Sequence, residues 1–263
     1  MGTTLVGNRD SHTVYHAVMP KRATIPTLLF ALAAISAGCG GFNIATLEPD
    51  ELQSYALEHF AEREYRDAQV AFTRLVTSYP AYAADPTTRL FLAHSHFGLR
   101  EFVLAASEYK RVNTSFPRAT EAAEASLGVC RSYVRLAPHP QRDQGFTDDA
   151  IISCLQTRQA YPATEVGIEA DELYKTARNL KAQKEFEIGE FYFKDFPASS
   201  EIFYLNVANL YPDTDWAPEA LLQLYRVYLG LGEAWDEEAA VMRSRLVTQY
   251  PDSNAARALE NGG

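Results

Sequence analysis

The sequence lacks the short motifs that mark the common catalytic and phosphate-binding sites. It has no Gly-x-Ser-x-Gly nucleophile elbow, no glycine-rich phosphate loop and no His-Glu-x-x-His zinc helix. His94 and His96 are two positions apart, so on a helix they point to nearly opposite sides and cannot chelate one ion. Acidic residues such as Glu62 and Glu64 fit solvated helix faces. We therefore expect no enzymatic activity, no metal site and no cofactor.

Positive charge is also scarce. The chain has 24 Lys and Arg residues against 34 Asp and Glu residues, which gives a formal net charge of −10. A surface this acidic does not gather phosphates, which argues against nucleic acid as a ligand. It also offers no basic patch for a membrane surface, so attachment to a membrane would depend on a lipid.

The apolar run near the N-terminus is short. It extends from Ile25 to Ala37, whereas a helix that crosses a bilayer needs roughly 20 residues. Two basic residues precede the run and small residues with Cys39 follow it, an order typical of a secretory signal. We expect residues 1–38 to be removed as a signal peptide, with Met19 as the true start.

The position of Cys39 resembles the bacterial lipoprotein signal, in which the new N-terminal cysteine is acylated. The pattern departs at Ser36, where such signals usually have Leu, Val or Ile, so a plain secreted protein is the alternative. Gly40 after the cysteine resembles lipoproteins that are sorted to the outer membrane. The resemblance implies that residues 39–48 form a lipidated N-terminus and linker, with the body held at the periplasmic face of the outer membrane.

A repeated pattern runs through the rest of the chain. Proline ends a helix, because it has no amide donor and clashes with the preceding turn. An aromatic residue followed by proline recurs at Tyr79-Pro80, Phe116-Pro117, Tyr161-Pro162, Tyr211-Pro212 and Tyr250-Pro251.

Counting back from each aromatic residue gives three recurring slots on one helix face. Small residues stand eleven positions earlier, at Ala68, Ala105, Ala150, Ser200 and Ala239. Seven positions earlier are Phe72, Tyr109, Cys154, Tyr204 and Arg243. Four positions earlier are Leu75, Val112, Thr157, Val207 and Leu246. Each such segment follows another amphipathic segment, so the unit is a helical hairpin that buries both apolar faces only by stacking.

This pattern resembles tetratricopeptide (TPR) repeats; the alternative is an ordinary helical domain with coincidental prolines. The resemblance implies an all-α fold, a right-handed superhelical solenoid of five TPR-like hairpins over residues 49–257. Arg243 fits a solvent-facing end cap, and residues 258–263 are expected to be a disordered tail. The repeats are expected at about 49–82, 86–118, 121–163, 165–213 and 216–252.

The two cysteines other than Cys39 fall in the third predicted hairpin. Cys130 and Cys154 lie on its two helices, so they could face one another and form a disulfide. The alternative is that Cys154 is a small buried hydrophobic residue.

The order of parts over 39–257 is similar to the TPR lipoproteins of the outer-membrane β-barrel assembly machinery. The match includes the cysteine signal and, in the first hairpin, the stretch from Tyr65-Arg66-Asp67-Ala68 through Tyr79-Pro80. It continues with the Arg142-Asp143 pair in a stretched turn, a Glu-rich helix that ends in Phe191-Tyr192, and the stretch from Tyr211-Pro212-Asp213-Thr214 to Leu231-Gly232. The chain departs at Phe203, where some members have an arginine that contacts the barrel-forming subunit.

This resemblance implies a non-catalytic periplasmic scaffold. Its implied partners are the barrel-forming subunit, other assembly lipoproteins, peptides of unfolded outer-membrane proteins, and the membrane through a lipid anchor. By analogy with TPR geometry, the first helices line a peptide-binding groove whose N-terminal part contains Gln53, Leu57, Phe60, Leu90, His94 and Phe97. The barrel-forming subunit would dock around Tyr225, Arg226 and Tyr228.

Other envelope functions fit the same fold and anchor. They are pilus or secretin assembly, coordination of cell division, and regulation of a peptidoglycan enzyme. The stretched third turn and the long fourth-repeat helix favour the barrel-assembly reading.

Overall fold

The computed structural model describes residues 44–261, and in this part of the chain every regular element is a helix. The predicted signal and Cys39 lie outside the described residues. Five pairs of helices follow one another: α1 (Pro49–Ala61) with α2 (Tyr65–Ser78), α4 (Pro86–Gly98) with α5 (Phe102–Ser115), α6 (Glu121–Leu136) with α7 (Gly145–Ala160), α8 (Glu165–Phe193) with α9 (Pro197–Leu210), and α10 (Trp216–Leu231) with α11 (Asp236–Gln249). Shorter elements are η1 (Ile44–Thr46), α3 (Pro80–Ala83), η2 (Glu233–Trp235) and α12 (Asn254–Glu260). The predicted all-α array of five hairpins is confirmed.

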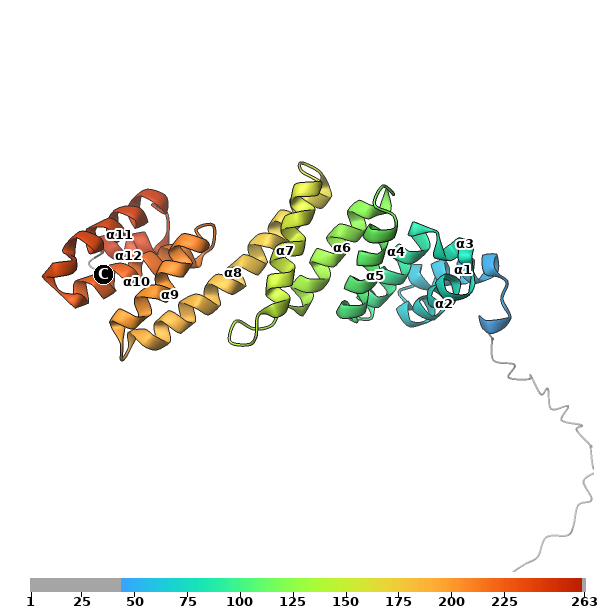
Figure 1. The fold of residues 1–263 in the computed structure, drawn as a ribbon, viewed down its shortest axis with the longest axis horizontal. Helices are drawn as coiled ribbons and strands as arrows, with labels where there is room; N and C mark the ends of the chain where they lie inside the picture. Colours follow the sequence, from blue (N-terminus) through green and yellow to red (C-terminus); the bar gives the residue numbers. More distant parts are fainter. Residues whose placement is uncertain (1–43, 262–263) are drawn as a thin grey trace, which may run out of the picture. The chain divides into compact units, whose positions relative to one another are not determined.

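The pairs pack against one another in chain order (Figure 1). The two helices of each pair are in contact, and each second helix also contacts the first helix of the next pair. The first helices α4, α6, α8 and α10 contact one another in succession. Each hairpin therefore buries its apolar faces against its neighbours, as stacked repeats require.

Helix α8 is the longest of the described helices, with 29 residues. It contacts α6 and α7, which precede it in the chain, and α9 and α10, which follow it. None of the helices that the structure describes combines the length and the apolar character needed to cross a membrane.

The five aromatic residues of the repeat end their helices. Each leaves the helical conformation as the C-cap, and its backbone N–H still donates to the carbonyl four residues earlier. These bonds are Tyr79 to Leu75 (3.1 Å), Phe116 to Val112 (2.8 Å), Tyr161 to Thr157 (3.0 Å), Tyr211 to Val207 (3.1 Å) and Tyr250 to Leu246 (3.0 Å). The proline that follows has no N–H with which to continue the ladder. The prediction that these prolines close the hairpins is confirmed.

The three slots counted back from the aromatic residue form the core between hairpins. All of their residues are buried except Arg243, and the adjacent Met242 is buried in that last helix instead. Thr157 is the polar member of the third slot, and its hydroxyl donates to the Ser153 carbonyl at 2.8 Å and to the Ser126 carbonyl at 3.2 Å. Exposure of Arg243 agrees with the predicted solvent-facing end.

Two glycines allow tyrosines of the repeat to approach a neighbouring helix closely. A Cβ atom at Gly128 in α6 would lie 2.6 Å from the ring of Tyr109 in α5. A Cβ atom at Gly189 in α8 would lie 2.6 Å from the ring of Tyr204 in α9. At these two tyrosines the second slot therefore has a glycine as its counterpart on the facing helix, which the repeat pattern did not predict.

Gly128→Ala is expected to destabilise the protein by about 1–2 kcal/mol. Overpacking against the Tyr109 ring costs about 1–3 kcal/mol, and the better helix propensity of alanine offsets up to about 1 kcal/mol of it. Thermal denaturation followed by circular dichroism checks this. Gly230→Ala is the control, because nothing lies within 4 Å of a Cβ there. Equal melting temperatures for Gly128→Ala and the wild-type protein would contradict the close packing.

The predicted disordered tail over residues 258–263 is wrong for residues 258–260. They belong to α12, whose Leu259 is buried together with Ala255 and Ala256. The helix packs on α10, and the Ser253 side chain caps it by accepting from the Ala256 N–H at 3.0 Å. The short helix covers the core at the last hairpin, which no further hairpin follows in the described residues.

Candidate functional site

The residues predicted to line the N-terminal groove lie on α1 and α4, and most of them are engaged in packing. Phe60 contacts Phe91 with ring centroids 5.0 Å apart and His94 at 6.2 Å. Leu90 and Phe97 pack on the core between α4, α5 and α6, and Gln53 is half-buried. Leu57 is the most exposed of the six, with 38% of its surface accessible. The structure thus brings Phe60 and His94 together but leaves Leu57 as the free apolar side chain.

His94 is held by a tyrosine of the repeat. Its Nδ1 atom and the Tyr109 hydroxyl are hydrogen-bonded at 2.7 Å, and the two rings lie edge to face. Burial, with a smaller contribution from the Arg131 charge, lowers the pKa of His94 to about 4. Burial likewise raises the pKa of the Tyr109 hydroxyl above its ordinary value. At neutral pH this pair is therefore uncharged and can form no ion pair with a ligand.

An ion-pair network joins α6 to α8 beside this pair. Arg131 binds both carboxylate oxygens of Glu169 at 2.6 Å and the Glu124 carboxylate at 2.7 Å. These hydrogen bonds lower the pKa of Glu169 and raise that of Arg131. The network was not predicted from the sequence, because Glu169 lies 38 residues from Arg131 in the chain and no local pattern marks the pairing. His96 has a different partner again, the Glu101 carboxylate at 2.8 Å.

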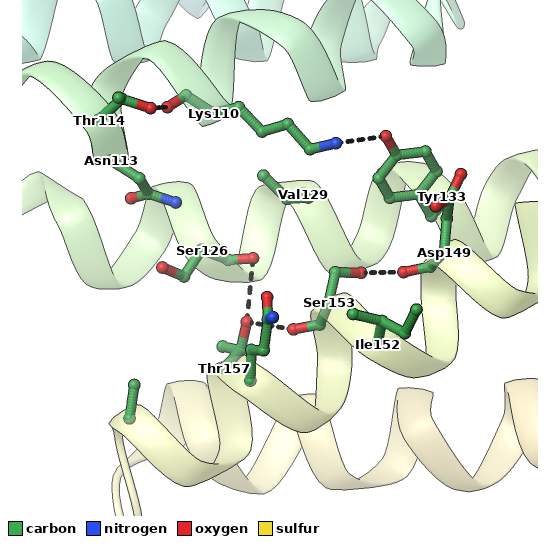
Figure 2. A pocket seen from close by; sticks show the side chains of 12 residues that line it. Lys110, Asn113, Thr114, Ser126, Val129, Tyr133, Asp149, Ile152, Ser153 and Thr157 are labelled. Carbon is green, nitrogen blue, oxygen red and sulfur yellow. Dashed lines mark hydrogen bonds between the residues drawn. The ribbon is translucent and has the colours of Figure 1, made fainter.

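A hollow of about 410 Å3 lies between α5, α6 and α7 (Figure 2). Much of its polar lining is satisfied within the protein: Lys110 donates to the Tyr133 hydroxyl at 2.6 Å, and the Ser153 hydroxyl donates to the Asp149 carbonyl at 2.8 Å. The Asn113 Oδ1 atom is buried without a hydrogen-bond partner. This hollow involves the second helices α5 and α7, whereas the predicted groove involves the first helices.

The three residues predicted to dock a partner differ in accessibility. Arg226 is exposed, Tyr225 is half-buried against the C-terminal core, and Tyr228 is 4% exposed. The Tyr228 hydroxyl donates to the Glu201 carboxylate at 2.7 Å, and its ring stacks on Trp235 at 5.6 Å. Tyr228 is therefore a packing residue, and its predicted place on a docking surface is corrected.

Phe203 stands where some TPR lipoproteins of the similar family have an arginine, and it is a packing residue. Its ring stacks on Tyr192 of α8 with centroids 5.3 Å apart and an interplanar angle of 3°. An arginine at this position would lose that aromatic stack. The position joins α8 to α9 and carries no charge for a partner.

The two remaining cysteines meet in the core of the third hairpin. Cys130 of α6 and Cys154 of α7 form a disulfide with Cα atoms 4.8 Å apart, and both residues are fully buried. Cys154 thus occupies the large-residue slot of its repeat and bonds to the facing helix. The structure therefore shows the disulfide rather than its alternative, an unbonded buried cysteine at position 154.

One group of side chains at the C-terminal end of α1 has the composition of a metal site. Ligand atoms of His59, Glu62 and Glu64 lie within 4.8 Å of one another at the surface. His59 already pairs with the Glu64 carboxylate, and both carboxylates are exposed. Exposed acidic groups of this kind are common without a metal. The absence of a metal site therefore stays a prediction.

The fold defines a class of protein: a tandem array of TPR-like helical hairpins. The profile of the YfiO family, described as outer membrane lipoprotein, matches residues 46–243. The chain belongs to this family.

Among relatives, the chain is 24% identical over 230 residues to the outer membrane protein assembly factor BamD of Caulobacter vibrioides. The alignment covers 84% of this chain and 75% of that protein.

Two solved structures align at 14% identity. The TPR2AB domain of yeast Sti1 in its pHSP90 complex is aligned over 79% of this chain and 80% of its own, with a TM-score of 0.39. Pseudomonas aeruginosa pilF is aligned over 82% and 97%, with a TM-score of 0.26. At these TM-scores neither structure bears on the function of this chain.

Proposed function

We propose that this chain is a non-catalytic scaffold in the assembly of outer-membrane β-barrel proteins. A lipid on Cys39 holds it at the outer membrane with its hairpins in the periplasm. The observation that carries the proposal is the similarity to the Caulobacter assembly factor over most of the chain. The outer membrane lipoprotein family supports the compartment, and a disulfide in the third hairpin suits an oxidising one.

The scaffold has two kinds of partner in this proposal. Its C-terminal hairpins dock the barrel-forming subunit, with other assembly lipoproteins in the same complex, and its first helices receive peptides of unfolded outer-membrane proteins. Leu57 is the groove residue with the most free apolar surface. An extended peptide gains affinity by placing alternate side chains against such positions.

Leu57→Asp is expected to weaken binding of a synthetic peptide, copied from the last strand of a barrel protein, by about tenfold. Losing the burial of one leucine costs about 1.5–3 kcal/mol, and 1.4 kcal/mol is a factor of ten in affinity. Fluorescence anisotropy with the labelled peptide measures the change. The matched control is Leu104→Asp, which places the same charge at an exposed leucine of the second helix α5. If both variants bind the peptide as the wild-type protein does, the groove assignment is wrong.

A further inference from the structure

An apolar pocket that the sequence did not indicate lies at the ends of three helices. It has a volume of about 310 Å3 and is formed by the end of α8, the start of α9 and the end of α10. Phe193, Phe196 and Pro197 form the side given by α8 and α9, and Val227 and Leu231 form the side given by α10. Ligand pockets span about 300–1,000 Å3, so this one fits one or two large side chains.

Arg226 is the only charged residue that lines this pocket. It is exposed and makes no hydrogen bond or ion pair with any residue that the structure describes, whereas Arg131 and Arg178 each hold carboxylates. Its charge therefore has no counterpart within the described part of an acidic chain. An arginine at the edge of an apolar pocket is suited to a carboxylate, which it can bind through two parallel hydrogen bonds.

Exposed apolar side chains accompany the pocket on the same elements. Phe196 is 63% exposed although it lines the pocket, Phe191 of α8 is 73% exposed, and Leu229 of α10 is 48% exposed. Aromatic residues and arginine are the residue types enriched where protein interfaces gain most of their affinity. A concave pocket with one cation, on a chain of net charge −10, suits a folded partner better than an anionic lipid surface.

We infer that this pocket receives a segment of the barrel-forming subunit in which a large apolar side chain stands beside an aspartate or glutamate. The apolar side chain enters between Phe196 and Val227, and the carboxylate pairs with Arg226. The inference rests on the proposed function, because that supplies the partner. It replaces the predicted docking residue Tyr228, which is buried, with the lining of the pocket.

The test measures binding of the purified full chain to the purified barrel-forming subunit in detergent. Arg226→Glu and Phe196→Ala are each expected to weaken the complex by about tenfold or more, and Arg226→Lys by less than Arg226→Glu. The matched control is Arg118→Glu, an exposed arginine between α5 and α6 that also makes no ion pair in the described structure and is expected to bind normally. Circular dichroism melts of each variant identify any that fail to fold.

The outcomes separate the inference from the proposed function. If the wild-type chain does not bind the subunit, the proposed function fails and the inference falls with it. If the wild-type chain binds and both pocket variants bind equally well, the inference alone is wrong. A photo-crosslinker at position 196 gives a second readout that needs no loss of charge. A crosslinked peptide of the subunit with an acidic residue next to a large apolar one supports the pocket assignment, whereas capture of lipid or of a second copy of this chain overturns it.

Discussion

Replacing Cys130 and Cys154 together by alanine is expected to lower the free energy of unfolding by about 3 kcal/mol. The two cysteines are 24 positions apart, and closing a loop of this size in the unfolded chain is worth roughly that amount. For a body of this length about 1 kcal/mol shifts the melting temperature by 2–4 °C, so the midpoint should fall by about 6–12 °C.

Thermal melts of the wild-type protein with and without dithiothreitol check the same prediction without a mutation. The reduced wild-type protein should melt close to the double alanine variant, and the variant should not respond to the reductant. Two free thiols titrated in the untreated wild-type protein would contradict the disulfide.

The second large effect is a loss of stability in mild acid that depends on His94. The folded protein holds the pKa of His94 at about 4, against about 6.5 in the unfolded chain. Between these values the unfolded chain binds more protons, so stability falls as the pH falls from about 6.5 towards 4. From pH 7 to pH 5 this residue should remove about 2 kcal/mol of stability.

Urea denaturation of the wild-type protein and His94→Gln at pH 7 and pH 5 isolates this contribution. Carboxylates such as Glu169, whose pKa is lowered by Arg131, also lose stabilisation in acid, but they do so in both proteins. The variant should therefore lose about 2 kcal/mol less than the wild-type protein between the two pH values. Equal losses would show that His94 is not buried against Tyr109 as the structure has it.

The hairpins could be predicted from the sequence because their signals are local. The helical periodicity, the small residue of the first slot and the closing proline all lie within one helix and its C-terminal end. The burial of the slot residues and the aromatic C-caps agree with this local pattern. The places of Cys130 and Cys154 on the two helices of one hairpin allowed a disulfide but left an unbonded Cys154 as the alternative, and the structure shows the disulfide. Residue Arg243 was recognised as exposed because it interrupts an otherwise apolar slot.

The features that escaped prediction depend on contacts between distant parts of the chain. Tyrosine is a residue type common at protein interfaces, but Tyr228 is buried in contact with Glu201 and Trp235. Leu259 was predicted to lie in a disordered tail, but it is buried in α12, which packs on α10. The apolar pocket needs the ends of three helices from two hairpins, and no sequence pattern records where those ends meet.

The central claim is that this stack of hairpins serves the assembly of outer-membrane β-barrel proteins. Depletion of the protein in its native host, followed by measurement of folded β-barrel proteins in the outer membrane by heat-modifiable gel mobility, tests it most directly. We expect the folded barrels to decrease before growth stops and wild-type protein to restore them. Normal barrel levels together with a defect confined to pili, cell separation or the peptidoglycan would contradict it.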